Sequence, residues 1–421
     1  MVVVKAEILA IGSELLEPPR QETNGPFLTE QLRAIGIDVV ARQTVADELG
    51  LVQAAFRTAL ARADVVIATG GLGPTEDDLT REAAAAALGR TMERDQAILD
   101  ALRTRFAARG RTMRVVNEKQ ADVIDGARVL RNENGTAPGQ CVEHGTQLVF
   151  LLPGPPLEMR PMFETHVRPM LAGRAGATVL RTRILRIAGL PESEVEELAA
   201  PIYKTTSNPR TTILGSAGEV ELRLTATGRE DEAEALLAEL GGRLSAALGE
   251  RVFSDDGRTL SEVVADLLRS RGLTLAVAES CTGGLLSAEL TAIPGASAFL
   301  ERAFVTYSNR SKCEELGVKL ALIETHGAVS EPVARAMARG ARAVARSAYG
   351  VGITGIAGPD GGTPEKPVGL VYVALAGEAR ETITRIRLPG SSRDRIRTYA
   401  VRVALEMLRR EILGLTPFDK A

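Results

Sequence analysis

The sequence predicts an α/β protein in which three domains follow one another along the chain. At 421 residues it is too long for a single ordinary domain. Aromatic residues make up only 3% of it and tryptophan is absent, so Leu, Val, Ile and Ala must build the cores, which favours packed α/β layers. Buried-strand patterns also alternate with amphipathic helix patterns over most of the chain.

Residues 1–170 are predicted to form a three-layer α/β domain. The first elements expected are strands at 6–12, 37–45 and 64–71 and helices at 24–36 and 49–63. This alternation favours βαβ units and a mainly parallel sheet. The later elements expected are a helix near 94–110 and strands at 127–130, 136–144 and 147–156, the last ending in a proline-rich loop.

Residues 171–255 are predicted to form a small α+β connector domain. The elements expected are strands at 178–189, 210–217 and 219–228 and helices at 191–202 and 230–249. No glycine-rich ligand loop interrupts them. A conformational or dimerising role is therefore favoured for this region over chemistry.

Residues 256–416 are predicted to form a second three-layer α/β domain. A helix is expected at 259–272, where Thr259 or Ser261 can cap the N-terminus and Glu262 complements the helix dipole. Strands and helices then alternate up to a final helix at 393–413, and residues 414–421 are expected to be a loose tail.

The composition argues against several classes of protein. The formal net charge of −3 gives no positive field to attract a nucleic-acid backbone. No apolar run approaches the roughly 18 residues that cross a bilayer, and the N-terminal residues read as a first strand rather than a signal peptide. We therefore expect a cytoplasmic protein that binds neither nucleic acid nor membranes.

The three cysteines do not indicate a disulfide framework or a zinc site. Cys141, Cys281 and Cys313 are odd in number, far apart and not in CxxC spacing. The ordinary interpretation of each is a buried or incidental thiol.

A hydroxyl-rich turn, "ESCTGG", follows the predicted strand that ends at Glu279. Ser280, Cys281 and Thr282 are the candidate nucleophiles. The glycines that follow allow close approach of a ligand and offer amide donors at a helix start, which suit a phosphate or an oxyanion. Simple helix capping by Thr282 is an equal alternative.

No histidine lies close in sequence to activate this serine. His326, in "ETHGAVSE", reads as a turn residue. A buried lysine can act as the base instead, with a tyrosine as a relay, and "TYSNRSK" supplies Tyr307 and Lys312. On a surface such a pair would be unremarkable, so the residue pattern alone leaves the base open.

The third region nevertheless resembles a known family. The motifs "ESCTGG", "AFVTYSNRSK", "GAVSEPVA", "GITGIAGPDGGTPEKPVG" and "RDRIR" together resemble the C-terminal domain of the CinA family, the nicotinamide mononucleotide deamidases also called PncC, over about residues 258–415. The resemblance implies hydrolysis of the carboxamide to nicotinate mononucleotide and ammonia, with Ser280 as nucleophile, Tyr307 and Lys312 activating it, and Cys281 as a packing neighbour.

The same resemblance suggests which residues bind the substrate. Candidates for the oxyanion hole and ring contacts are Thr282, Gly283, Thr354 and Gly355. Ser297 is a candidate substrate ligand, with helix capping as the equal alternative. Arg393 and Arg397 suit a nucleotide phosphate, with the alternative that one of them faces solvent. No metal-ligand cluster occurs here, which fits a serine amidase without a cofactor.

A second ligand loop, "ATGGLGPTEDD", leaves a predicted strand of the first domain. Its glycines let the backbone approach a phosphate, and Asp77 and Asp78 could hold a divalent ion that bridges it. Ordinary helix capping is the alternative. The loop is neither a P-loop nor a Rossmann fingerprint.

With "AIGSELL", "ENGTAPG" and "LPGPPLEM", this loop resembles the N-terminal domain of the same family, which is similar to the molybdopterin-binding MoaB and MogA proteins, over about residues 4–170. The resemblance implies hydrolysis of ADP-ribose to AMP and ribose 5-phosphate with Mg, Mn or Co. The implied metal ligands are Glu14, Asp77 and Asp78, the phosphate contacts are Gly71, Gly73 and Thr75, and Asn134, Gly135 and Thr136 line the site. The family's "DTN" element is "ETN" here, at residues 22–24, after an unusual "EPPRQ".

The leading hypothesis is a bifunctional, homodimeric enzyme of pyridine-nucleotide salvage. One alternative is a first domain that only binds a molybdopterin-like or nucleotide ligand. The other is an interaction protein of competence or DNA repair, against which the acidic charge balance argues.

Overall fold

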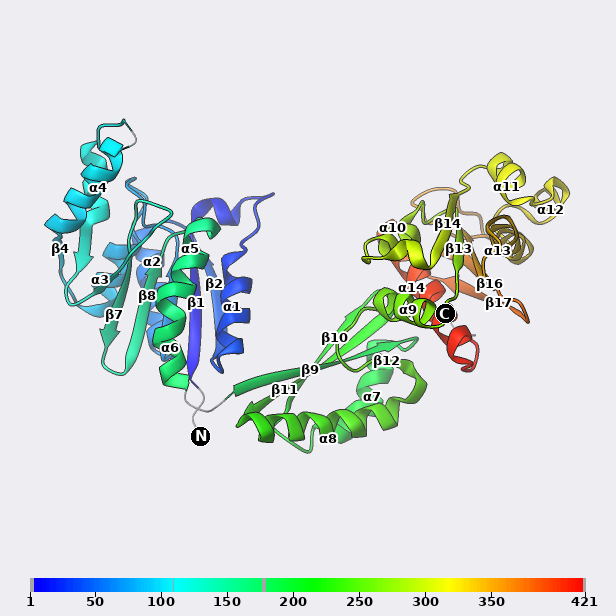
Figure 1. Ribbon diagram of the computed structural model, residues 1–421, viewed down its shortest axis with the longest axis horizontal. Coiled ribbons are helices and arrows are strands. Elements are labelled where there is room, and N and C mark those ends of the chain that lie inside the picture. The colour runs from blue at the N-terminus through cyan, green and yellow to red at the C-terminus, as the bar shows by residue number, and fades with distance from the viewer. Residues whose placement is uncertain (1–3, 109, 176–178, 419–421) are drawn as a thin grey trace. The chain divides into compact units, whose positions relative to one another are not determined.

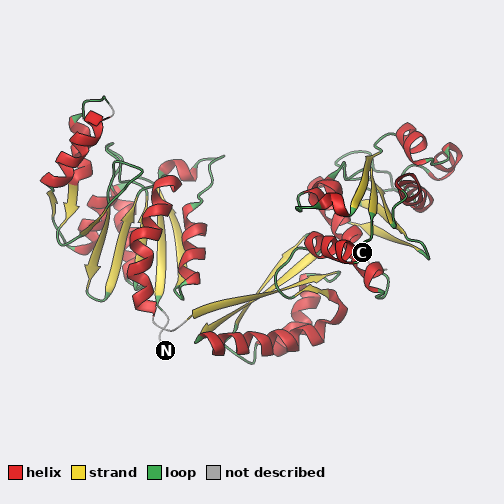
Figure 2. Cartoon of the chain, viewed as in Figure 1, coloured by secondary structure: helices red, strands yellow, loops and turns green. Residues whose placement is uncertain are grey.

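The computed structural model describes residues 4–108, 110–175 and 179–418. The chain divides into two compact units, residues 1–181 with 226–235 and residues 182–225 with 236–421. Figure 2 shows that helices cover the sheets of both units. No helix within the described ranges combines the length and apolar character needed to span a bilayer.

The N-terminal domain is built on a six-stranded sheet in the order β2-β1-β3-β8-β7-β6. The first four of these strands are parallel, and β7 and β6 are antiparallel additions at one edge. The strands are β1 (Lys5–Ile11), β2 (Asp38–Val45), β3 (Val65–Thr69), β6 (Arg128–Leu130), β7 (Gly139–His144) and β8 (Gln147–Leu152). A separate hairpin pairs β4 (Met92–Arg94) with β5 (Asp122–Ile124).

Helices cover both faces of this sheet and bury two apolar clusters (Figure 1). One face packs against α1 (Asn24–Ala34), α5 (Pro156–Met162) and α6 (Arg168–Ala175). The other packs against α2 (Leu49–Leu60) and α3 (Thr80–Leu88), while α4 (Gln96–Ala108) has a small cluster of its own. Because helices cover both faces, the central strand β3 is buried along its whole length.

The connector is a four-stranded sheet in the order β10-β11-β9-β12 with two helices. Its elements are β9 (Val179–Ala188), α7 (Glu192–Tyr203), β10 (Arg210–Ser216), β11 (Glu219–Gly228), α8 (Glu230–Leu248) and β12 (Val252–Ser254). The short strand β12 has too few residues for a periodic signal, so the sequence did not reveal it. The first residue of the strand expected at 178–189 lies outside the described residues.

The C-terminal domain has a mixed five-stranded sheet in the order β14-β13-β15-β16-β17. Parallel pairing joins β13 to β14 and β15, and antiparallel pairing adds β16 and β17. The strands are β13 (Leu275–Glu279), β14 (Leu300–Val305), β15 (Tyr349–Gly355), β16 (Leu370–Ala376) and β17 (Glu381–Arg387). The helices are α9 (Leu260–Ser270), α10 (Leu285–Thr291), α11 (Asn309–Leu316), α12 (Leu320–His326), α13 (Glu331–Ala345) and α14 (Arg393–Leu413).

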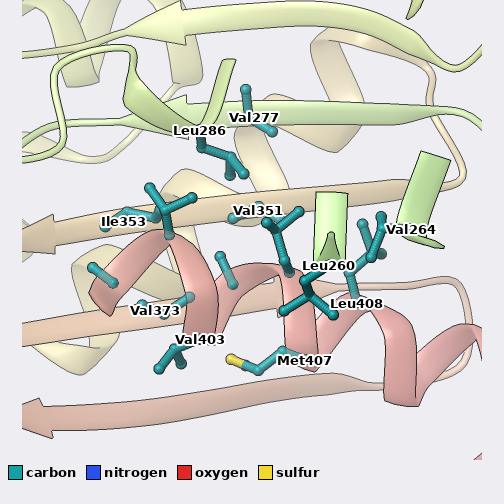
Figure 3. Packing of buried hydrophobic residues seen from close by; sticks show 14 of the residues in the cluster. Leu260, Val264, Val277, Leu286, Val351, Ile353, Val373, Val403, Met407 and Leu408 are labelled. Atoms are coloured by element: carbon teal, nitrogen blue, oxygen red, sulfur yellow. The ribbon is translucent and has the colours of Figure 1, made fainter. Parts of the chain in front are cut away.

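Packing of α9, α10 and α14 against one face of this sheet forms the largest core (Figure 3). The other face is covered by α11, α12 and α13. Thr259 caps α9 in a capping box with Glu262, as the sequence predicted. Both three-layer domains and the small connector confirm the predicted α/β class. The short strands β4, β5 and β12 and the helices α5, α6 and α12 were not expected.

The prediction of a loose C-terminal tail is wrong for residues 414–418; residues 419–421 lie outside the described part. The Phe418 carbonyl accepts a hydrogen bond from Thr384 Oγ1 at 2.7 Å, and the Phe418 ring packs against Gly189 of the connector. Arg410 also donates to the Thr416 carbonyl at 2.9 Å. These contacts fasten the tail to β17 and to the connector.

A buried ion cluster on α14 strengthens the same junction. Glu406, with 1% of its surface exposed, accepts hydrogen bonds from Arg409 at 2.7 and 2.9 Å and from Arg410 at 2.6 Å. Arg409 also donates to the Glu250 carbonyl of the connector at 2.6 Å. One carboxylate therefore compensates two buried guanidinium groups.

We expect Glu406→Gln to destabilise the second unit by about 3–5 kcal/mol, because it leaves the buried Arg409 without a carboxylate and leaves Arg410 with only the half-exposed Glu250 at 3.5 Å. The matched control is Glu411→Gln, whose partner Arg380 is 42% exposed and whose loss should cost at most about 1 kcal/mol. Calorimetric unfolding of the full chain measures both. Equal effects of the two substitutions would contradict the assignment.

Candidate active sites

Three loops meet at one edge of the C-terminal sheet. Because β13, β14 and β15 are parallel, their carboxyl ends lie at the same edge, which is where ligands bind in open α/β sheets. Ser280 follows β13, Tyr307 follows β14, and Thr354 lies at the end of β15. Two of the motifs identified in the sequence are joined here by direct contact.

Ser280 is in direct contact with Lys312. The Lys312 Nζ lies 3.0 Å from the Ser280 Oγ. The same nitrogen donates to the backbone carbonyls of Thr306 at 2.7 Å and Tyr307 at 3.4 Å. Because these carbonyls can occupy both N–H groups of a neutral amine, its lone pair would point toward the serine hydroxyl.

Lys312 is held where its charged form is disfavoured. Lys312 is only 1% exposed, and no carboxylate of the described chain forms an ion pair with it. Burial lowers the pKa of Lys312 from its ordinary value, and the nearby thiols of Cys281 and Cys313 oppose this less strongly. A lysine with a lowered pKa can serve as a general base.

Cys281, the neighbouring candidate nucleophile, is in the opposite condition. It is 6% exposed, and burial raises the pKa of its thiol to about 12. The thiolate is the reactive form of cysteine, so Cys281 is unreactive at neutral pH. It packs in the apolar cluster under α9 and α14.

Glu279 holds the helix that follows residues 280–283, a segment that we call the nucleophile turn because it contains the candidate nucleophile Ser280. Its carboxylate is fully buried and accepts hydrogen bonds from the amides of Leu286 at 3.1 Å and Ser287 at 2.9 Å and from the Ser287 hydroxyl at 2.5 Å. It thereby satisfies the free N–H groups of α10. Gly284, with a φ of 91°, is the N-cap residue of this helix, so Thr282 is not its cap.

The nucleophile turn is closed by a hydrogen bond from the Gly283 amide to the Ser280 carbonyl at 3.0 Å. Arg397 donates to the Thr282 carbonyl from Nη2 at 2.8 Å and from Nε at 3.3 Å. Within the described ranges, no acceptor is bonded to the amides of Cys281 or Thr282. These amides directly follow the serine, where oxyanion-hole donors commonly lie.

Tyr307 lies at the rim of the site rather than beside the serine. Tyr307 is 63% exposed, and its hydroxyl accepts a hydrogen bond from Arg393 Nη2 at 3.3 Å. Arg393 also donates to the Gly358 carbonyl at 2.6 Å. Tyr307 and Lys312 therefore occupy different positions, although the sequence grouped them.

Three other candidates from the sequence are placed as follows. Thr354 donates its hydroxyl to the Ala328 carbonyl at 2.9 Å, and Gly355 pairs with β16. Ser297 is exposed and precedes β14. It therefore lies at the opposite end of the strands from Ser280, and the structure does not bring it together with the other candidate residues. It does not cap a helix either.

The N-terminal domain contains a cavity of about 800 Å³ at the carboxyl ends of β1, β3 and β8. Its lining includes seven of the residues predicted for this site, namely Glu14, Gly71, Gly73, Thr75, Asp77, Asp78 and Thr136. Asn134 and Gly135 do not line it. Asn134 instead donates to the Leu157 carbonyl at 2.9 Å, and the Gly135 amide donates to Asn132 at 2.8 Å.

Asp78 is engaged within its own loop. Its carboxylate accepts hydrogen bonds from the Gly73 amide at 2.8 Å, the Thr75 amide at 2.8 Å and the Thr75 hydroxyl at 2.5 Å. It therefore holds the glycine-rich loop in place. It does not cap the helix α3 that follows, whose N-cap residue is Leu79.

Glu14 and Asp77 are exposed carboxylates on the same cavity. In the described part of the chain, no three His, Cys, Asp or Glu side chains converge closely enough to hold a metal ion, so the three predicted ligands do not form a preformed cluster. One or two carboxylates still suit a magnesium-type ion whose other ligands are water and substrate phosphates. The donor set fits a metal that binds together with a diphosphate.

Several cavity residues were not singled out from the sequence, although four of them lie within the motifs quoted above. They are Arg20, Asn24, Asp47, Thr69, Gln120 and Glu158. Glu22 of the variant "ETN" element accepts a hydrogen bond from the Gly25 amide at 2.7 Å and so supports the start of α1.

Comparison with known proteins agrees with this arrangement of domains. The family model "CinA C-terminal domain" matches residues 257–412, "Probable molybdopterin binding domain" matches residues 7–173, and "Damage-inducible protein CinA KH domain" matches residues 182–254. A CinA-like protein of Solibacter usitatus is 46% identical over 412 residues, which cover 98% of this chain and 99% of that protein. The chain belongs to the CinA family.

Other members of the CinA family show a similar extent of identity. A putative competence-damage inducible protein of Symbiobacterium thermophilum is 45% identical over 422 residues, covering 97% of this chain and 99% of that protein. The crystal structure of the competence/damage inducible protein CihA from Agrobacterium tumefaciens is 44% identical and covers 35% of this chain and 91% of that one, with a TM-score of 0.35.

Proposed function

We propose that the C-terminal domain is a serine amidase that hydrolyses the carboxamide of nicotinamide mononucleotide to nicotinate mononucleotide and ammonia. The contact between Lys312 Nζ and Ser280 Oγ, 3.0 Å long and buried, carries this proposal. The substrate is suggested by the resemblance of the surrounding motifs to CinA-family deamidases.

The geometry favours Lys312 over Tyr307 as the proton acceptor. The neutral amine takes the Ser280 proton as the oxygen attacks the carboxamide carbon, and the amides of Cys281 and Thr282 are placed to stabilise the resulting oxyanion. The lysine then gives this proton to the carboxamide nitrogen. The C–N bond breaks, ammonia departs, and the acyl group remains bound to Ser280 as an ester. Water attacks this ester by the same route, which releases the carboxylate and restores the hydroxyl.

We expect the purified chain to release ammonia from nicotinamide mononucleotide in the presence of a chelator. Ser280→Ala should lower this rate by about 10³-fold or more, because the nucleophile is lost. Ser270→Ala, at an exposed position on α9, is the matched control. An inactive wild type, or an active Ser280→Ala variant, would refute the proposal.

The lowered pKa of Lys312 also predicts the pH dependence. Only the neutral amine accepts the proton, so kcat/KM should fall as the pH falls through the lowered pKa and level off above it. Lys312→Arg should be inactive at every pH because a guanidinium does not deprotonate. A pH–rate profile checks this, and Tyr307→Phe should keep the acidic limb. Loss of that limb in Tyr307→Phe would transfer the base role to Tyr307.

For the N-terminal domain we propose metal-dependent hydrolysis of ADP-ribose to AMP and ribose 5-phosphate. The cavity of about 800 Å³, lined by the glycine-rich loop and by the Glu14 and Asp77 carboxylates, supports this proposal. These two carboxylates would hold the ion, which when bound neutralises charge on the diphosphate. The loop amides would contact the phosphate oxygens.

We expect Glu14→Gln and Asp77→Asn each to lower AMP release by about 10- to 100-fold at fixed Mg²⁺ and to weaken Mn²⁺ binding measured in the presence of AMP. Glu48→Gln, which alters an exposed residue outside the cavity, is the control. Binding of ADP-ribose without AMP release by the wild type would instead favour the alternative of a ligand-binding domain.

A further inference from the structure

We infer that Arg397 is a positioning residue for the nucleophile turn and not a ligand of the substrate phosphate, an inference that rests on the proposed amidase function. Its guanidinium donates twice to one atom, the Thr282 carbonyl oxygen, at 2.8 and 3.3 Å. The two guanidinium nitrogens that face the turn, Nε and Nη2, are therefore both engaged by the protein backbone.

The orientation of this carbonyl determines the orientation of the turn. The peptide group between Thr282 and Gly283 is planar, so a carbonyl directed at Arg397 sends the Gly283 N–H the other way, where it bonds to the Ser280 carbonyl. Gly283 has a φ of 58° and no Cβ, so this peptide could rotate with little steric cost. Arg397 opposes that rotation.

Few other groups fix the orientation of Thr282 besides Arg397. Thr282 is fully buried, and among the described residues the one other donor to its carbonyl is the Leu285 amide, at 3.2 Å. Its hydroxyl has no partner within the described ranges, so the side chain does not fix the turn. Without the guanidinium, only the backbone bonds from Gly283 to Ser280 and from Leu285 to Thr282 would hold the turn that presents the amides of Cys281 and Thr282.

Arg393, one helical turn earlier on α14, gives the contrast. It contacts the Gly358 carbonyl and the exposed Tyr307 hydroxyl, and in the described part of the chain it makes no hydrogen bond to the nucleophile turn. Asp394 approaches Arg397 at 3.6 Å but is 93% exposed, so it adds little. The two arginines, which look equivalent in "RDRIR", are directed at different parts of the site.

The experiment compares Arg397→Lys, Arg397→Gln, Arg393→Gln and Arg395→Gln in the full chain. Arg395 is exposed on the same helix and has no ion-pair partner among the described residues, so Arg395→Gln is the matched control. We measure kcat and KM for nicotinamide mononucleotide. A second readout, the rate at which a fluorophosphonate probe labels Ser280, does not depend on the natural substrate.

We expect Arg397→Gln to lower kcat and the labelling rate by about 10- to 100-fold, with KM changed by no more than about twofold. Arg397→Lys should recover part of the loss, and added guanidinium ion should restore part of the labelling in Arg397→Gln. Arg393→Gln should raise KM and leave the labelling rate unchanged.

A raised KM with unchanged kcat and labelling in Arg397→Gln would make Arg397 a substrate ligand and overturn the inference. So would values equal to those of wild type, or a loss that neither lysine nor guanidinium ion reverses. Failure of the proposed function is distinguishable, because the wild type itself would then neither release ammonia nor label at Ser280.

Discussion

Burial of the Lys312 amine without a counter-charge is the constraint on which the site of the second unit depends. A carboxylate beside it would stabilise the ammonium form and remove the base. The nearest acidic residue in sequence to the nucleophile, Glu279, is fully buried too, but its oxygens are taken by the amides and hydroxyl at the start of α10. The fold thus buries both Glu279 and Lys312 near Ser280 but gives the carboxylate and the amine separate hydrogen-bond partners.

Elsewhere in the same unit, buried charges are paired. Glu406 compensates Arg409 and Arg410. Arg402 lies between Glu219 of the connector and Glu289 of α10, the helix that follows the nucleophile turn. These arginines are on α14, as Arg397 is, so one helix both fastens the connector and holds the turn. The contrast shows that the unpaired state of Lys312 is particular to the site.

The N-terminal domain also holds its ligand loop through backbone groups. Arg81, buried below the loop, donates to the carbonyls of Leu72 at 2.9 Å and Gly73 at 3.1 Å. Lys119 donates to the Asp78 carbonyl at 2.5 Å. With the Asp78 carboxylate bound to the amides of Gly73 and Thr75, the loop is fixed before a ligand arrives, which reduces the entropy lost on binding.

The sequence by itself determined the layered α/β architecture, because strand and helix periodicity repeat over long segments. It also determined the capping box of α9 and the loops that meet at the sheet edges. It missed the strands β4, β5 and β12 and the helices α5, α6 and α12, which are too short for a periodic signal. It also missed the docking of the tail, which depends on Gly189 more than two hundred residues away. Among the candidate residues, motif likeness identified Ser280 and Lys312 together.

Only the tertiary structure decided which of Tyr307 and Lys312 touches the serine, and which of Arg393 and Arg397 reaches its turn. Residues five or fewer positions apart share the same local pattern, while their contacts depend on what other segments pack over them. Burial of Lys312 and the position of Ser297 at the opposite end of the strands likewise depend on how distant segments pack. Local periodicity fixes the elements of this protein, and the surroundings that packing creates fix their chemistry.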